Sequence, residues 1–197
     1  MATAAEVKRL REETNAGVMD CKRALEETGG DIEKAKKWLH EKGIAGAEKK
    51  AERETSQGLV ESYIHAGGRI GVLVEVNCET DFVARTDEFQ KLVRDLAMQV
   101  AGLAPRYVDV DRIPAAELAA KKTALLADEA VQSKPESIRE KIVDGQLNKW
   151  YKEVCLLEQP FRDEDRSVRD LVTERISTIG ENIRVRRFVR FALGEEL

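Results

Sequence analysis

The sequence has few of the residues that build metal sites, disulfides and nucleophilic centres. Only three cysteines and two histidines occur among its 197 residues. Cys21, Cys78 and Cys155 are odd in number, far apart and in no Cys-x-x-Cys spacing, which favours structural thiols in a reducing compartment over a disulfide framework. With only His40 and His65 available, a zinc site would be hard to assemble. We therefore expect neither a metal nor a cofactor.

Long apolar runs and an excess of basic residues are also missing. No stretch of about 20 apolar residues occurs, and the N-terminal letters MATAAE lack a basic region leading into an apolar one. The 33 basic residues are outnumbered by 37 acidic ones, giving a net charge of −4. No global positive field would therefore recruit nucleic acid or an anionic membrane. These absences predict a soluble, cytoplasmic chain whose partner is a protein or a small ligand.

The first 43 residues contain three short runs of helical periodicity. Asn15-Ala16-Gly17 and Gly29-Gly30 separate the runs, Asp31 is a good N-cap for the third, and Gly43 is expected to end it. The residues that share a helical face recur at helical spacing and are Val7, Leu10 and Thr14, then Val18, Cys21, Leu25 and Thr28, then Ile32, Ala35, Trp38 and Leu39.

This three-helix module, residues 1–43, has a small core, so we expect it to pack against another surface. Val18 and Met19 stand at the start of its second helix. They suit either the core or a docking surface, and the pattern alone leaves both interpretations open.

Residues 44–57 are rich in Ala, Glu and Lys and predict a charged linker that is helical in part. Two runs that alternate as strands follow, at about 58–66 and 69–78, and Gly67-Gly68 between them is a tight-turn signal. They predict an antiparallel hairpin. One face of its second strand would carry Ile70, Val72, Val74, Val76 and Cys78.

Helices should cover this hairpin and project from it. Thr86 can cap a helix with apolar positions at Phe89, Leu92, Val93, Leu96, Val100 and Leu103, and Pro105 closes it. Residues 114–157 then predict a helical hairpin, with one helix from Pro114 to about Gln132 and a second after Lys134-Pro135, kinked at Gly145. Ser167 can cap a last helix that Gly180 stops.

A third strand, about 183–193, completes a small three-stranded antiparallel sheet, so the fold class is α+β and residues 58–197 form its core domain. One face of this strand would carry Ile183, Val185, Val189, Phe191 and Leu193. The other face carries Arg184, Arg186, Phe188 and Arg190, with Arg187 nearby. These arginines would suit phosphate binding, but we favour edge protection and ordinary solvation because the chain is acidic.

The end of the second strand is the most informative stretch. The alternation stops at Glu79-Thr80-Asp81, and this polar triplet delivers Phe82 and Val83 into a turn or the first turn of a helix. Phe82 is either a core residue, the commoner fate of a Phe, or an anchor presented to a partner beside Asp81 as an oriented acceptor.

Three motifs in order resemble the elongation factor Ts family. They run from Leu10 to Leu25 (LREETNAGVMDCKRAL), from Glu75 to Ala84 (EVNCETDFVA) and from Ile179 to Ile183 (IGENI). The likeness extends from near Val7 to about Gly194, and includes EQPF after the helical hairpin. It is to the short form of the family, since this chain has no length to encode the second sheet subdomain of longer members.

The resemblance implies a guanine nucleotide exchange factor for elongation factor Tu, not an enzyme. Its first helices would form a ubiquitin-associated-like module, joined to a core domain with a small antiparallel sheet. In the family, the Thr-Asp-Phe-Val segment intrudes near the magnesium site of the partner. Carried over, these residues are Thr80, Asp81, Phe82 and Val83, with Phe82 as the wedge. Further contacts map to Arg11, Val18, Met19, Lys22, Ile179 and Gly180. Val18 departs from the family, because many members have Met there.

Two other classes of function stay open alongside this one. An enzyme could use Cys78 as nucleophile and His65 as base, but no oxyanion motif accompanies them and Cys78 falls on an apolar strand face. A helical adaptor could bind proteins through its first three helices. In either the exchange factor or the adaptor, we expect a homodimer, because the last strand has a long apolar face without cover.

Overall fold

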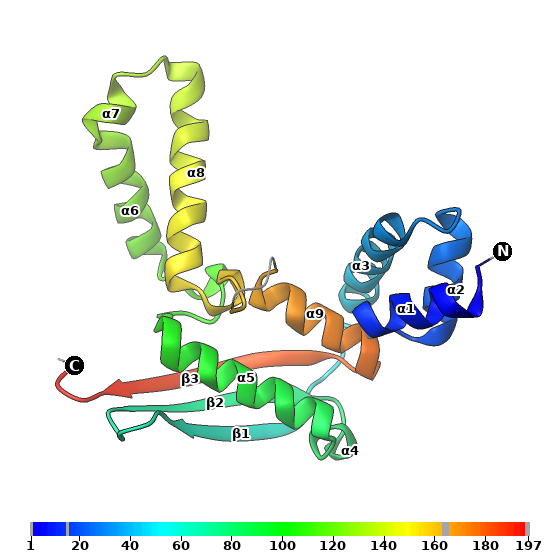
Figure 1. The fold of residues 1–197 in the computed structure, drawn as a ribbon. Helices are drawn as coiled ribbons and strands as arrows, with labels where there is room; N and C mark the ends of the chain where they lie inside the picture. Colours follow the sequence, from blue (N-terminus) through cyan, green and yellow to red (C-terminus); the bar gives the residue numbers. More distant parts are fainter. Residues whose placement is uncertain (1, 15, 163–165, 196–197) are drawn as a thin grey trace. The chain divides into compact units, whose positions relative to one another are not determined.

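The computed structural model describes residues 2–14, 16–162 and 166–195, so the predicted break at Asn15 lies outside the described residues. Three strands form one sheet in the order β1-β2-β3 (Figure 1). The strands are β1 (Gln57–Ile64), β2 (Ile70–Cys78) and β3 (Ile183–Ala192). The amide of His65 donates to the Ile70 carbonyl across the hairpin. Between β2 and β3, Leu193 bonds to Arg69 and Arg187 to Glu75, so both pairings are antiparallel. The α+β class and the antiparallel sheet are confirmed.

The chain divides into two compact units. The first unit comprises Met1–Leu59, Val76–Leu92 and Asp170–Arg184. The second unit comprises Val60–Glu75, Val93–Arg169 and Val185–Leu197. Each strand contributes residues to both units, as does helix α5 (Asp87–Leu103). The division into domains at residues 43 and 57 stays a prediction.

The first unit begins with α1 (Ala4–Thr14), α2 (Val18–Glu27) and α3 (Ile32–Glu48). Asp31 caps α3 as predicted, because its carboxylate accepts from the Lys34 amide at 3.0 Å. The core of the three helices is small, as expected for so short a segment. Its buried members are Leu10, Cys21, Ala24, Leu25 and Ala35.

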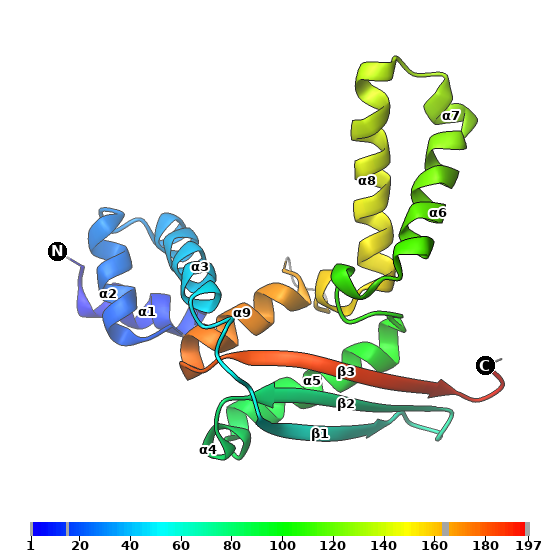
Figure 2. The ribbon, with the colours of Figure 1, turned by 180° about the vertical axis from the view of Figure 1, so that it is seen from behind.

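The predicted end of the third helix at Gly43 is wrong. Helix α3 continues to Glu48, because Ala45 and Ala47 propagate it well once it is nucleated. Gly43 is buried inside the helix, where an added Cβ would lie 3.8 Å from the Ser177 Cβ on α9 (Val168–Ile179). The two helices lie side by side within the first unit (Figures 1 and 2). Gly43 therefore serves close helix packing, not helix termination.

In the second unit, α6 (Ala115–Ala127), α7 (Glu129–Gln132) and α8 (Glu136–Val154) form the predicted helical hairpin (Figure 2). A single helix up to Gln132 was wrong, because the backbone is extended at Asp128 and the Asp128 carboxylate caps α7 by accepting from the Ala130 amide at 2.8 Å. Helix α8 runs through Gly145 without ending. The interior is apolar; its buried members are Ile113, Val131, Val143, Leu147, Trp150, Val154 and Cys155.

Helix α5 buries the stripe that its periodicity predicts, except at its last turn, where Leu103 is exposed. Thr86 caps it by accepting from the Phe89 amide at 3.3 Å. Phe89, Leu92, Val93, Leu96 and Val100 are all buried. Within the described residues, none of the helices is both long and apolar enough to cross a lipid bilayer.

The last strand does not keep one apolar face throughout. Its alternation is interrupted where Arg186 and Arg187 are both exposed and both donate to the Glu75 carboxylate, at 2.8 and 2.6 Å. Two consecutive residues opposite one is the arrangement of a β-bulge. The predicted face is therefore wrong beyond this point: Ile183 is buried, whereas Val189, Phe191 and Leu193 are exposed.

Candidate partner-binding site

All ten residues predicted to contact a partner lie in the first unit. They come from three stretches of sequence that are far apart: the start of the chain, the end of β2 and the end of α9. The fold gathers them into one compact body. The residues are Arg11, Val18, Met19, Lys22, Thr80, Asp81, Phe82, Val83, Ile179 and Gly180.

Phe82 projects from a tight turn that follows β2. Thr80 caps the short helix α4 (Asp81–Ala84), because its hydroxyl accepts from the Val83 amide at 3.3 Å. Val83 and Ala84 are buried and hold the turn against the body, whereas the Phe82 side chain is 77% exposed. The interpretation of Phe82 as a core residue is therefore wrong. Asp81 is also exposed and pairs with Arg85 at 2.8 Å.

Two carboxylates that sequence reasoning did not single out hold this turn. Glu181 accepts from the amides of Glu79 and Thr80 at 3.1 and 3.0 Å and from the Thr80 hydroxyl at 2.7 Å. Glu79 accepts in turn from the Asn182 amide at 2.6 Å. Both acids lie inside the two quoted motifs, EVNCETDFVA and IGENI, but no local pattern pairs residues about a hundred positions apart.

The end of α9 completes this part of the site. Gly180 has φ +88°, a conformation that favours glycine, and its amide donates to the Ile176 carbonyl at 3.1 Å. The predicted helix stop at Gly180 is confirmed. Ile179 is half-buried, and the chain then passes directly into Glu181 and Asn182.

The helical module presents an apolar hollow with a basic rim. Its cavity volume is about 410 Å³. Val18 is 48% exposed and its neighbour Met19 68%, which favours docking over the core for both. Lys8, Arg11 and Lys22 supply the positive rim, and the lining is completed by Ala2, Ala4 and Val7. This arrangement suits an apolar side chain flanked by acidic groups.

The cysteine beside the turn is not equipped for nucleophilic chemistry. Cys78 is fully buried and its thiol donates to the Thr80 carbonyl at 3.1 Å. Burial, reinforced by the Glu181 carboxylate, raises the pKa of the thiol to about 11. The thiolate that an enzyme would need is thus scarce at neutral pH. Among the described residues, no three His, Cys, Asp or Glu side chains gather closely enough to hold a metal ion.

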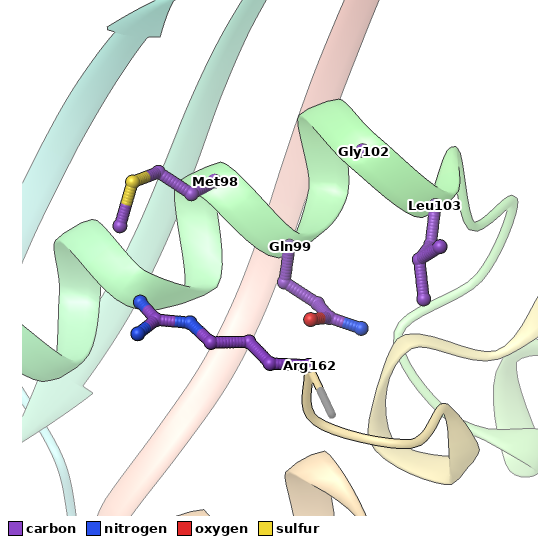
Figure 3. Close-up of a pocket in the computed structure, with 5 residues that line it drawn as sticks. All are labelled: Met98, Gln99, Gly102, Leu103 and Arg162. Atoms are coloured by element: carbon purple, nitrogen blue, oxygen red, sulfur yellow. The ribbon is translucent and has the colours of Figure 1, made fainter. Parts of the chain in front are cut away.

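A second hollow lies beside α5 (Figure 3), with a cavity volume of about 380 Å³. Arg162 reaches along it and pairs with Asp95, while the Gln99 amide donates to the Pro160 carbonyl at 3.1 Å. The remaining lining residues, Met98, Gly102 and Leu103, are apolar or lack a side chain. Among the described residues that line it, none has a side chain that is a nucleophile or a general base.

The basic side chains of β3 have acceptors within the chain. Arg186 and then Arg187 lower the pKa of Glu75 by hydrogen bonding to its carboxylate. Arg190 pairs with Glu195 at 3.2 Å, and Arg184 donates to the Ala51 carbonyl. This favours pairing within the fold over phosphate binding.

Sequence comparison assigns this architecture to a class, the translation elongation factors. The chain belongs to the elongation factor Ts family. The family model described as Elongation factor TS matches residues 45–195. The chain is 56% identical to the elongation factor Ts of Moorella thermoacetica, over 99% of this chain and 97% of that protein. It is 57% identical to that of Carboxydothermus hydrogenoformans (100% and 91%) and 55% identical to that of a Cyanothece species (98% and 74%).

Proposed function

We propose that this protein is a guanine nucleotide exchange factor that binds elongation factor Tu carrying GDP in the cytoplasm. Thr80, Asp81, Phe82 and Val83 perturb the magnesium and phosphate site of that partner and promote GDP release during translation elongation. Membership of the elongation factor Ts family supports the partner. The observation that carries the mechanism is Phe82, a large apolar side chain held in solvent on a capped turn.

Exchange of this kind requires no catalytic side chain. Two ligands that each distort the other's site weaken one another by the same coupling free energy, so a factor that displaces Mg²⁺ raises the off-rate of the nucleotide. A tenfold faster release needs the barrier to fall by about 1.4 kcal/mol. Burying one Phe contributes roughly 1.5 to 3 kcal/mol. Burial of Phe82 is therefore sufficient for about a tenfold acceleration, and a much larger one would also draw on the helical module and the end of α9.

Magnesium removal tests this mechanism. The chain should accelerate release of fluorescent GDP from elongation factor Tu in millimolar Mg²⁺. When the metal is chelated, spontaneous release rises and the acceleration by the chain should shrink, because the chain and the chelator weaken the same contact. An acceleration of equal size with and without Mg²⁺ would show that the metal site is not where the chain acts.

The module's hollow and Met19, which is exposed next to the lining residue Val18, form the proposed docking surface for the same partner. Met19→Ala removes exposed apolar area, so it should raise the KM for elongation factor Tu several-fold while leaving the saturating release rate and the melting temperature nearly unchanged. Steady-state exchange at varied partner concentration separates the two constants. Ile44→Ala, at an exposed aliphatic position on α3 that is not part of the proposed docking surface, is the control. An unchanged KM for Met19→Ala would remove the docking role of the module.

The working unit is further proposed to be a homodimer that pairs the open face of the sheet. In the second unit, the register that joins Arg69 to Leu193 sets Val189 opposite Leu73 and Phe191 opposite Gly71. Together with Val60 and Ile64 on β1, Leu73, Val189 and Phe191 give the sheet a group of exposed apolar side chains. Such a face is self-complementary about a two-fold axis, which hides both copies at once.

A charge in this face should separate the protomers. Val189→Asp places a carboxylate opposite Leu73. Burying this carboxylate in the dimer interface would cost more free energy than the apolar contacts of the interface contribute at this position. Light scattering at micromolar concentration should report half the wild-type mass, in the presence or absence of reductant. Ile138→Asp, at an exposed position of the helical hairpin, should leave the mass unchanged. A monomeric and fully active wild type would refute the dimer.

A further inference from the structure

The exposed turn is fastened by two carboxylates that each bind the backbone of the other's segment. Glu181 accepts from two amides and one hydroxyl of the Glu79-Thr80 segment, at 2.7 to 3.1 Å. Glu79 accepts from the amide of Asn182, the residue after Glu181, at 2.6 Å. We name this pair the reciprocal clamp. It joins the strand end that leads to Phe82 with the end of α9.

The clamp extends to the segment that follows α3. The Asn182 side chain is buried and its amide donates to the Arg53 carbonyl at 2.9 Å. The Arg53 guanidinium reaches the Glu79 carboxylate at 3.4 Å. Hydrogen bonds to charged acceptors are among the stronger ones. Three stretches of the first unit are thus held by one polar network.

The turn needs such support because it has little of its own. Helix α4 is four residues long, too short to be stable by itself. The Phe82 side chain is 77% exposed in the free protein, so little packing of its own fixes where it points. The backbone that carries it is restrained by the burial of Val83 and Ala84, by the network at Thr80, and by the Thr86 hydroxyl, which donates to the Val83 carbonyl at 2.8 Å.

We infer that Glu79 and Glu181 are positioning residues for exchange, an inference that rests on the proposed function. The clamp holds Thr80 in its capping conformation, and Thr80 sets the orientation of the α4 turn and of Phe82. It also fixes the spacing between the wedge and the predicted contact at Ile179 and Gly180. Both contacts therefore meet the partner as one preorganised surface. Little conformational entropy then remains to be lost when the turn is fixed in the exchange step.

Three variants of the full chain test the inference. Glu181→Ala removes all three acceptor contacts. Glu181→Gln keeps an amide oxygen for the backbone amides and an amide NH₂ that can donate to the Thr80 hydroxyl. Glu195→Ala is the matched control: like Glu181, Glu195 accepts from a backbone amide, but it lies in the second unit, where it pairs with Arg190. Each variant is measured by amide hydrogen exchange in the free chain and by GDP release from elongation factor Tu.

For Glu181→Ala we expect the amides of Glu79 and Thr80 to exchange about tenfold faster. The saturating GDP-release rate should fall about tenfold while KM stays within about twofold. The reason is that the orientation of Phe82 matters in the exchange step and not in the initial binding of the partner. Glu181→Gln should restore most of both quantities, and Glu195→Ala should leave both at wild-type values.

The inference is overturned if Glu181→Ala releases GDP at the wild-type rate, whether or not its amides exchange faster. It is also overturned if only KM changes, since that would make Glu181 an ordinary binding contact. A fully active Glu181→Ala beside an impaired Phe82→Ala is failure of the clamp alone. Failure of the proposed function looks different: the wild-type chain itself would give no acceleration, and the role of the clamp would fall with it.

Discussion

Replacing Phe82 with Ala should reduce the saturating rate of GDP release from elongation factor Tu about tenfold or more, with little effect on folding. The side chain is 77% exposed in the free chain, so truncation removes little buried area and the melting temperature should stay within about 2 °C of wild type. In the complex, the same side chain is proposed to insert beside the magnesium site. Losing roughly 1.5 to 3 kcal/mol there corresponds to a tenfold or greater loss of rate.

Phe89, seven residues later, is a buried Phe and serves as the control for loss of stability. It is fully buried on α5, so Phe89→Ala should lower the free energy of unfolding by about 3 to 5 kcal/mol. Thermal melts and stopped-flow GDP release on both variants separate loss of fold from loss of function. A Phe82→Ala melting temperature that falls as far as that of Phe89→Ala would return Phe82 to a structural role.

Gly58→Ala should be the most destabilising single-methyl change in the sheet. Gly58 has φ +145°, outside the range that residues with side chains readily adopt. An added Cβ would lie 2.1 Å from the Val76 carbonyl oxygen and 2.7 Å from the Asn77 Cα, both of which are backbone atoms of β2. Backbone strain and overpacking each cost about 1 to 3 kcal/mol, so we expect a loss of roughly 3 kcal/mol or more.

For a chain of this length, such a loss lowers the melting temperature by about 6 to 12 °C. Gly46→Ala is the matched control, because Gly46 lies inside α3 and an added Cβ meets nothing within 4 Å. That variant should be neutral or more stable by about 0.5 to 1 kcal/mol. Calorimetry of the two variants checks both signs, and a Gly58→Ala protein as stable as wild type would mean that β1 and β2 do not approach so closely.

Local chemistry made much of this fold predictable. Apolar spacing identified α5 and its buried face, and capping residues such as Asp31 and Thr86 marked helix starts that the structure confirms. The exposure of Phe82 was open from sequence because a Phe at a strand end is compatible with either fate. In the structure the neighbours Val83 and Ala84 occupy the core at this turn, and Phe82 is left exposed.

What the sequence could not reveal depends on distant neighbours. The pattern around Gly43 looks like a helix stop, and only the approach of Ser177 explains a glycine inside the helix. A bulge at Arg186 and Arg187 depends on Glu75, about 110 residues earlier, which accepts from both. The reciprocal clamp likewise pairs Glu79 with the Glu181 segment. Each is a tertiary contact that no periodicity of two or 3.6 residues encodes.

We propose above that this chain releases GDP from elongation factor Tu by means of the exposed Phe82. The most direct measurement is the release of fluorescent GDP from purified elongation factor Tu, chased with excess unlabelled nucleotide, with no addition, with saturating wild-type chain and with saturating Phe82→Ala. We predict a rate many times the spontaneous one with wild type and at least tenfold slower with the variant. A wild-type rate equal to the spontaneous rate, or a variant as fast as wild type, would contradict the claim.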